Sequence, residues 1–398
     1  MKIKNLFFAS AVLIASLTGC NKEDGVGEPK NEAGEGSLRI VLQQPDTRAG
    51  STNTPSNYKI AFDTGALLFV DAAGTIHRYV QIVPNAAPGV VTAADLVTGV
   101  VFEQIHEDVT EVHVIGNVDM GSGPYANLQA ALDKATTLFD QVDEPSYGLA
   151  KATMYGFGTL AVNTNPSDNW DKEAHVDLEA LVARFEVDKI SAQLTTVVTN
   201  PDNTQTTYTI SPTYNLGGIY INYAHYKVDL AGMPTGVAGD FISNGQTPGN
   251  YKPETDLGKY KDEWFPYVYE SNIGGTPYAS SDALGAISPA NETWAFNLFT
   301  ATTPHIIIHL TGVSVNGSLF NGDGNAYLTV SRYLSTVAPI GSPLNVKGNN
   351  VYRIKDLHFT YEDLSTIPEP ATTYSVNVTV TPVVWTIHEV TGGIDREP

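Results

Sequence analysis

Short segments of alternating apolar and polar residues recur along most of this 398-residue chain. They are rich in Val, Ile, Thr and Tyr and lie between clusters of Gly, Asn, Asp and Pro, as β-strands separated by turns do. Many short strands with turns between them favour β-sandwiches over a wound α/β sheet. We therefore predict an all-β fold with minor helices, and the strand segments are residues 65–71, 111–118, 183–190, 206–214, 218–228, 305–315, 326–333, 350–362 and 374–390.

Helical periodicity is confined to the first half of the chain. Residues 123–142 carry apolar side chains at a spacing close to 3.6, and Pro124 suits a first helical position. Residues 92–105 indicate a second, shorter helix. We expect both helices to be additions to a β-domain.

The length of the chain indicates two domains, because one core rarely extends over so many residues. The polar run at residues 163–174 has the composition of a turn-rich connection. We therefore predict two tandem β-sandwich domains, residues 49–173 and 174–398, with the boundary placed to within about 15 residues.

The amino terminus has the pattern of a secretory signal at Met1–Cys20. Lys2 and Lys4 precede an apolar stretch that is too short to cross a bilayer. The stretch ends in "SLTGC", which resembles a bacterial lipobox in which Cys20 becomes lipidated, the alternative being an ordinary signal with an incidental cysteine. Cys20 is the only cysteine, so no internal disulfide forms.

The formal net charge is −21, and the first 48 residues hold as many cations as anions. The body behind them is therefore strongly acidic, which argues against nucleic acid or anionic lipid as a partner.

A strand pattern follows the Gly- and Glu-rich linker at residues 21–36. In residues 37–44 the apolar side chains of Leu38, Ile40 and Leu42 alternate with others, and a polar loop around Arg48 comes directly after. We predict a strand that buries these three side chains in front of a loop that a protease can reach.

Several features in order resemble the Bacteroidales fimbrillin family, the major subunits of surface fimbriae. They are the lipobox, the strand before Arg48, "ALLFVDAAGTIHRY", "HVDLEALVARFEVDKI", "NNVYRIKDLHF" and an alternating tail that ends near Trp385. The resemblance implies two transthyretin-like β-sandwich domains exported as an outer-membrane lipoprotein. It also implies that an arginine-specific protease removes the lipidated segment with its first strand, and that a neighbouring subunit donates a strand in its place. In this sequence the cleaved bond is that between Arg48 and Ala49, although Arg48 is one of several arginines.

The carboxyl-terminal tail is the candidate donor strand. Val376, Val378 and Val380 reproduce the spacing of Leu38, Ile40 and Leu42, and beyond Pro382 the apolar parity changes to Val383, Trp385 and Ile387. Since Pro cannot donate to a ladder, we expect a bulge or crossover there. The alternative is that residues 374–390 form the last strand of their own domain.

Other motifs favour structure over chemistry. His305 and His309 flank three isoleucines, which indicate a strand and not a helical zinc site. "NGDGN" at residues 321–325 fits a hairpin turn better than a calcium loop. The aromatic residues within 251–294 could stack on sugars or pack into loops. We predict no catalytic residue, no metal and no cofactor.

We therefore expect a polymerising subunit of a surface fimbria that supports adhesion. Its partners would be other copies of itself, accessory fimbrial subunits and the protease, with surface ligands unspecified. An anchor or a tip subunit of the same fimbria, and a surface glycan-binding lipoprotein, are the alternatives.

Overall fold

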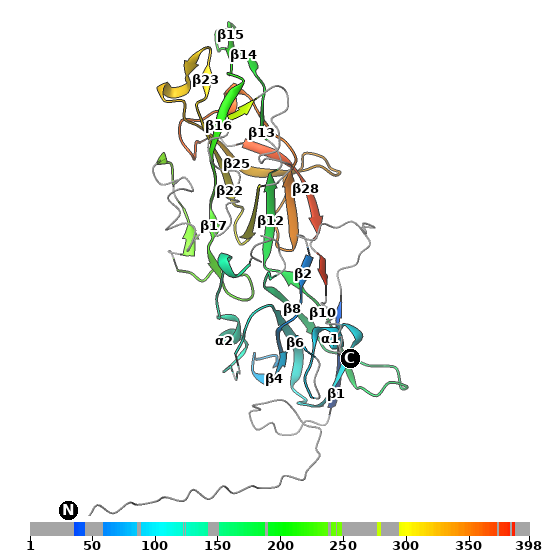
Figure 1. Ribbon diagram of the computed structural model, residues 1–398. Helices are drawn as coiled ribbons and strands as arrows, with labels where there is room; N and C mark the ends of the chain where they lie inside the picture. The colour runs from blue at the N-terminus through cyan, green and yellow to red at the C-terminus, as the bar shows by residue number, and fades with distance from the viewer. Residues whose placement is uncertain are drawn as a thin grey trace, which may run out of the picture.

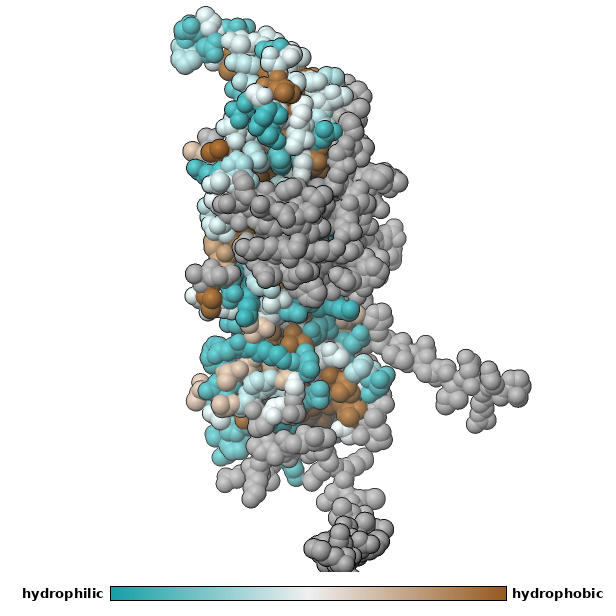
Figure 2. All heavy atoms as spheres, turned by 60° about the vertical axis from the view of Figure 1, so that its left-hand side comes forward, coloured by the Kyte–Doolittle hydropathy of each residue, from teal (hydrophilic) through white to brown (hydrophobic). Residues whose placement is uncertain are grey.

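The computed structural model describes residues 36–43, 59–85, 89–121, 123, 125–141, 151–187, 190–237, 240–243, 245–248, 277–279, 294–371, 374–382 and 384–386. These residues form an elongated body with two groups of strands, one below the other in Figure 1. On the face shown in Figure 2 the apolar residues lie in small separate groups among hydrophilic ones. No helix in the described part of the chain is long and apolar enough to cross a bilayer.

Strands dominate the structure, which confirms the predicted all-β fold with minor helices. In the first half they are β1 (Gly36–Gln43), β2 (Lys59–Ala61), β3 (Gly65–Asp71), β4 (Ile76–Ile82), β5 (Val100–Ile105), β6 (Val109–Gly116), β7 (Thr136–Thr137), β8 (Met154–Thr159), β9 (Ala161–Val162), β10 (Lys172–Asp177) and β11 (Glu179–Ala180). In the second half they are β12 (Val182–Val187), β13 (Ile190–Ala192), β14 (Thr195–Thr199), β15 (Gln205–Thr209), β16 (Thr213–Asn222), β17 (Ala224–His225), β18 (Lys227–Val228), β19 (Phe241–Ile242), β20 (Pro277–Ala279), β21 (Trp294–Phe299), β22 (His305–Thr311), β23 (Ser314–Val315), β24 (Ser318–Leu319), β25 (Ala326–Ser335), β26 (Asn350–Ile354), β27 (Leu357–Phe359), β28 (Tyr374–Pro382) and β29 (Val384–Thr386).

The lower sandwich packs a four-stranded sheet, in the order β5-β1-β10-β9, against a five-stranded sheet, β11-β8-β6-β3-β4. Phe69 of β3 meets Phe102 of β5 between the two sheets at a ring-centroid distance of 5.2 Å. Gly156 and Gly158 of β8 lie so close to β10 that a Cβ at either position would be 2.0 or 2.3 Å from a backbone oxygen. These glycines let the two sheets approach closely.

The upper sandwich is built from the strand order β20-β16-β22-β25-β28-β26-β12-β21. β28 joins its two halves, because Tyr374–Val378 pair with β25 and Thr379–Pro382 pair with β26. The halves pack on one another: Phe185 of β12 lies 5.3 Å from Tyr333 of β25 between ring centroids. Both of these side chains are buried.

The two sandwiches are joined by backbone pairing as well as by the chain. β2 pairs with β29, and β7 pairs with β18. One buried apolar cluster runs through strands of both. β11 is the last strand in the lower sandwich and β12 the first in the upper one, and the predicted boundary near residue 173 stays a prediction.

The two predicted helices are much shorter than expected. α1 covers only Ala93–Thr98, which begins at a capping box of Thr92 and Asp95 and ends at Gly99 with φ 98°. The β-branched residues that follow form β5. α2 covers only Leu128–Leu132, capped by Asn127, after which the chain forms β7 and a 3₁₀ turn, Leu138–Gln141.

Several of the longer predicted strands correspond to more than one element. Residues 183–190, 206–214, 218–228, 305–315 and 350–362 each fall across more than one element. Tyr223, with φ 53°, separates β16 from β17, and Gly312, with φ 69°, lies between β22 and β23. A 3₁₀ turn at Phe320–Gly322 precedes β25, and another at Tyr361–Asp363 follows β27.

Candidate strand-exchange site

The first strand, β1, lies inside a sheet and not at its edge. It pairs antiparallel with β5, where Leu38 is opposite Phe102, and parallel with β10, where Ile40 is opposite Ala174. Leu38, Ile40 and Leu42 are 0, 0 and 2% exposed. The alternation in the sequence therefore corresponds to one fully buried face of a doubly paired strand.

The walls around this face are apolar. Phe102 and Ile105 of β5, and Ala174 and Val176 of β10, are all buried and belong to the same cluster as the three side chains of β1. Without β1, the two flanking strands would present unpaired edges beside an apolar groove. Such edges readily accept another strand.

The outward face of β1 carries polar contacts that the sequence pattern did not reveal. Both the backbone N–H and the hydroxyl of Ser37 donate to Asp171 Oδ2, at 2.8 and 2.9 Å. The N–H of Ser37 is the main reason that the pKa of Asp171 is lowered. Arg39 forms an ion pair with Glu173 of β10. Such pairs need the register of β1 against β10, which is not visible in a strand read alone.

The proposed cleavage point lies outside the described residues, as do Cys20, Arg48 and Ala49. The other arginine of the leader, Arg39, is in the middle of β1 and pairs in register with Val101 of β5 and Glu173 of β10. A protease must hold its substrate backbone in an extended, unpaired form, so the fold shields Arg39.

The first part of the tail is held within its own chain. Val376 and Val378 of β28 are 5 and 0% exposed and belong to the buried core, whereas Val380 is 37% exposed. Because β28 links the two halves of the upper sandwich, removing it would separate β25 from β26.

Beyond Pro382, the structure describes the tail only over β29. β29 pairs with β2 over three residues, with Trp385 opposite Ile60. Figure 1 shows this red strand beside the blue β2, between the two sandwiches. Val383 and Ile387 lie outside the described residues.

The two histidines around the isoleucine run lie in β22 and have separate partners. His305 Nδ1 is 2.9 Å from Glu369 Oε2, and His309 Nε2 is 3.0 Å from Asn325 Oδ1. Burial lowers the pKa of His309. Among the described residues there is no group of three or more His, Cys, Asp or Glu side chains placed to hold a metal ion.

The two remaining candidate sites are the motif "NGDGN" and the aromatic segment. In "NGDGN", Asp323 accepts the backbone N–H of Asn325 at 2.9 Å, as in an Asx turn. Most of the aromatic segment 251–294 lies outside the described residues.

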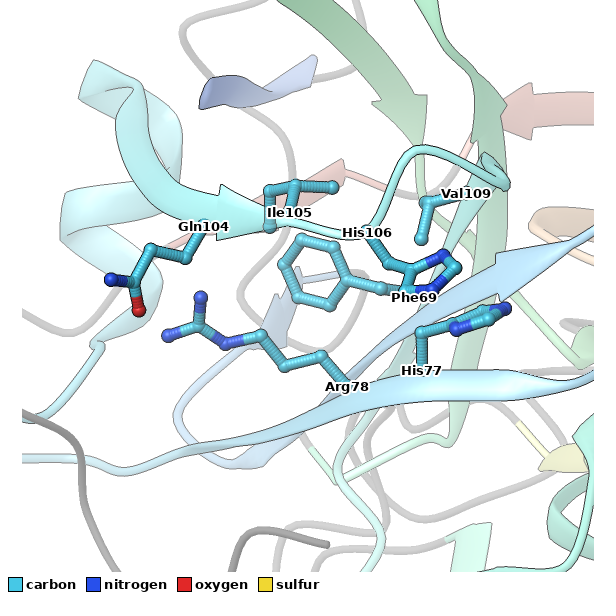
Figure 3. Close-up of a pocket in the computed structure, with 7 residues that line it drawn as sticks. All are labelled: Phe69, His77, Arg78, Gln104, Ile105, His106 and Val109. Atoms are coloured by element: carbon cyan, nitrogen blue, oxygen red, sulfur yellow. The ribbon is translucent and has the colours of Figure 1, made fainter. Parts of the chain in front are cut away.

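A small pocket lies on the lower sandwich (Figure 3). In it the ring of His77 stacks on that of His106 at 4.2 Å, and His77 Nε2 lies 3.1 Å from Asp71. Asp71 has a pKa lowered to about 2, first because it accepts the backbone N–H of Thr75. The lining side chains include no Ser, Thr, Cys, Lys, Asp or Glu and are Phe69, His77, Arg78, Gln104, Ile105, His106 and Val109.

Comparisons with known proteins find solved structures that are similar to this one at low sequence identity. No family model and no curated protein matches the chain. A fimbrilin from Porphyromonas gingivalis is similar in structure, with 13% identity over 89% of this chain and 99% of that one, at a TM-score of 0.45. A candidate cell adhesion protein from Parabacteroides distasonis has 12% identity over 89% of this chain and 98% of that one, at a TM-score of 0.48. Another, from Bacteroides eggerthii, has 14% identity over 90% of this chain and 99% of that one, at a TM-score of 0.44.

Proposed function

We propose that this chain is a structural subunit of a surface fimbria that polymerises by strand exchange. It is exported as a lipoprotein through Cys20, cleaved after Arg48, and built into an extracellular fibre that supports adhesion. The observation that carries the proposal is the position of β1, which is doubly paired and fully buried on one face, and Arg48 follows it in the sequence.

Removal of β1 costs the protein free energy that another strand in the same groove would restore. Each buried aliphatic side chain contributes about 1.5–3 kcal/mol, so Leu38, Ile40 and Leu42 together contribute on the order of 5–9 kcal/mol. The ladders to β5 and β10 add to this. An open groove of this kind associates with any strand that restores the burial and the pairing.

The structure favours the second part of the tail as the replacement. Donating Val376 and Val378 would divide the upper sandwich, whereas residues after Pro382 are held by the short ladder to β2. Val383, Trp385 and Ile387 have the same spacing as the three side chains of β1. The roughly 16 residues beyond Pro382, at about 3.3 Å each, reach roughly 50 Å, which is enough to cross a neighbouring sheet.

Donation from one copy to the next gives an open assembly. The donor surface and the acceptor groove are different, so the contact is heterologous and extends into a filament unless it closes into a ring. The strand supplies main-chain hydrogen bonds, and its side chains set the register.

The experiment is electron microscopy of purified precursor before and after treatment with an arginine-specific protease. We expect monomers before cleavage and fibres after it, with Ala49 at the amino terminus of the fibre subunits. Arg48→Gln should stay monomeric. Compact monomers from fully cleaved protein, or fibre subunits that still begin at Cys20, would contradict the proposal.

The same material separates the alternatives. An anchor would retain its lipid and its leader in the assembled fibre, and a tip subunit would accept a strand from a cleaved copy but donate none. A glycan-binding lipoprotein would bind glycans as a monomer and form no fibres after cleavage.

A further inference from the structure

On the outside of β1, the guanidinium of Arg39 lies among Glu173, Trp170 and the backbone oxygen of Thr98, which together we call the slot. It forms the ion pair with Glu173 of β10, and its Nη2 donates to the backbone oxygen of Thr98 at 3.3 Å. Its Cζ also lies 5.0 Å from the ring centroid of Trp170, just before β10. One side chain of the leader strand therefore contacts three residues of the body, which lie in two segments far apart in the sequence.

The slot fits the guanidinium of Arg39 in shape as well as in charge. Gly99, with φ 98°, forms part of its wall, and a Cβ there would lie 2.5 Å from Arg39 Nη2. The indole Nε1 of Trp170 is buried and has no hydrogen-bond partner among the described residues, and Arg39 Cζ lies over the face of the ring. A flat aromatic face, a carboxylate and a carbonyl together match the chemistry of a guanidinium.

Cutting the chain after Arg48 breaks none of these contacts. All of them involve Arg39, and the contacts between Ser37 and Asp171 likewise lie within β1. The three buried side chains and both ladders also lie within residues 36–43. Cleavage alone therefore leaves the leader strand in place.

We infer that Trp170, Glu173 and the Thr98 carbonyl form an arginine-binding slot that retains the cleaved leader strand until another strand displaces it. The inference rests on the proposed function, and it adds a guanidinium-specific site to the apolar groove. The slot adds to the retention of the leader in the groove and so slows its replacement by another strand.

The tail cannot fill this slot. Residues 374–393 contain no Lys or Arg, so no register that places Val383, Trp385 and Ile387 in the groove brings a guanidinium or an ammonium group beside Glu173. His175 also lies beside Glu173, with Nε2 3.3 Å from Oε2. The slot thus distinguishes the leader strand from the tail of a second copy.

The test measures how long the cleaved leader stays bound. Precursor labelled with a fluorophore near residue 30 is treated with the arginine-specific protease and chased with excess unlabelled peptide covering residues 36–48. We expect the wild-type leader to co-elute with the body, and its release to be on the order of 10-fold faster in Arg39→Gln and in Glu173→Gln. Higher salt should accelerate release of the wild type more than that of either variant.

Matched controls make the outcome specific. Arg332→Gln removes an exposed arginine from β25, in the other sandwich, and should leave the release rate unchanged. If Arg39→Gln precursor does not fold, the chase is repeated with wild-type body and a peptide carrying Gln in place of Arg39. Equal release of both peptides, or no retention of the wild-type leader, overturns the inference.

Failure of the slot and failure of the proposed function have different signatures. Slot-dependent retention without fibres after displacement would contradict polymerisation and leave the slot intact. If fibres form but the leader is released at the same rate in the wild type, Arg39→Gln and Glu173→Gln, only the slot is contradicted.

Discussion

Ile60 in β2 and Trp385 in β29 are register partners in a parallel ladder. The first described strand after the proposed cleavage point therefore lies beside the last described strand of the tail. Because this ladder covers three residues and β28 joins two halves of a sandwich, the two parts of the tail differ in how easily they can leave. The break between them is at Pro382, where the chain cannot donate a ladder hydrogen bond.

The first prediction separates these parts by truncation. Removing residues 383–398 should leave a folded precursor that has lost about 1–3 kcal/mol and forms no fibres after cleavage. Removing residues 374–398 should abolish cooperative unfolding, because β25 and β26 lose the strand between them. Circular dichroism during thermal unfolding measures both effects, and normal fibres from the shorter truncation would show that the donor lies elsewhere.

The second prediction concerns the buried face of β1. Ile40→Ala removes buried methyl groups from the core and should destabilise the uncleaved precursor by about 2–5 kcal/mol. Val162→Ala, at a side chain that is 74% exposed, should change the free energy of unfolding by no more than about 0.5 kcal/mol. Urea unfolding compares the two variants. Equal, small effects would mean that β1 contributes little to the lower core.

The alternation in the sequence was enough to predict β1 and its inward face, since burial every second residue is a local property. The outward contacts of β1 were not predictable, because Arg39 meets Glu173 only through a parallel register between segments far apart in the chain. The helix over residues 123–142 was predicted too long for a similar reason: Thr136 and Thr137 pair with Val228 and Lys227 of the second half. The change of parity at Pro382 indicated two tail segments, but their partners depend on tertiary structure.

The third prediction tests the close contact between the two lower sheets. Gly156→Ala places a Cβ 2.0 Å from the backbone oxygen of Asp177, so β8 and β10 must separate. We expect a loss of at least about 3 kcal/mol, at the upper end of overpacking effects. Gly36→Ala is the matched control, since its Cβ would lie 3.6 Å from the nearest backbone oxygen, an ordinary contact. Similar stabilities of the two variants would argue against this packing.

The fourth prediction concerns the acid sensitivity of the lower sandwich. His113 of β6 is 4% exposed, and burial lowers its pKa from 6.5, although its hydrogen bond to Glu111 partly opposes the shift. Its other ring nitrogen lies 2.8 Å from the hydroxyl of Tyr155, whose pKa is raised to about 12 so that it stays neutral. Below pH 6.5 the unfolded chain takes up a proton at this histidine that the folded protein does not.

Stability should therefore fall as the pH is lowered from about 7.5 to about 5.5. His113→Gln cannot titrate, so the variant should lose less of its free energy of unfolding over this range than the wild type does. His225 and His309, whose pKa values burial also lowers, keep part of the dependence in the variant. Urea unfolding at the two pH values measures the difference, with His175→Gln, at a side chain that is 49% exposed, as the control. An unchanged pH dependence in His113→Gln would show that this imidazole takes up its proton equally well in the folded protein.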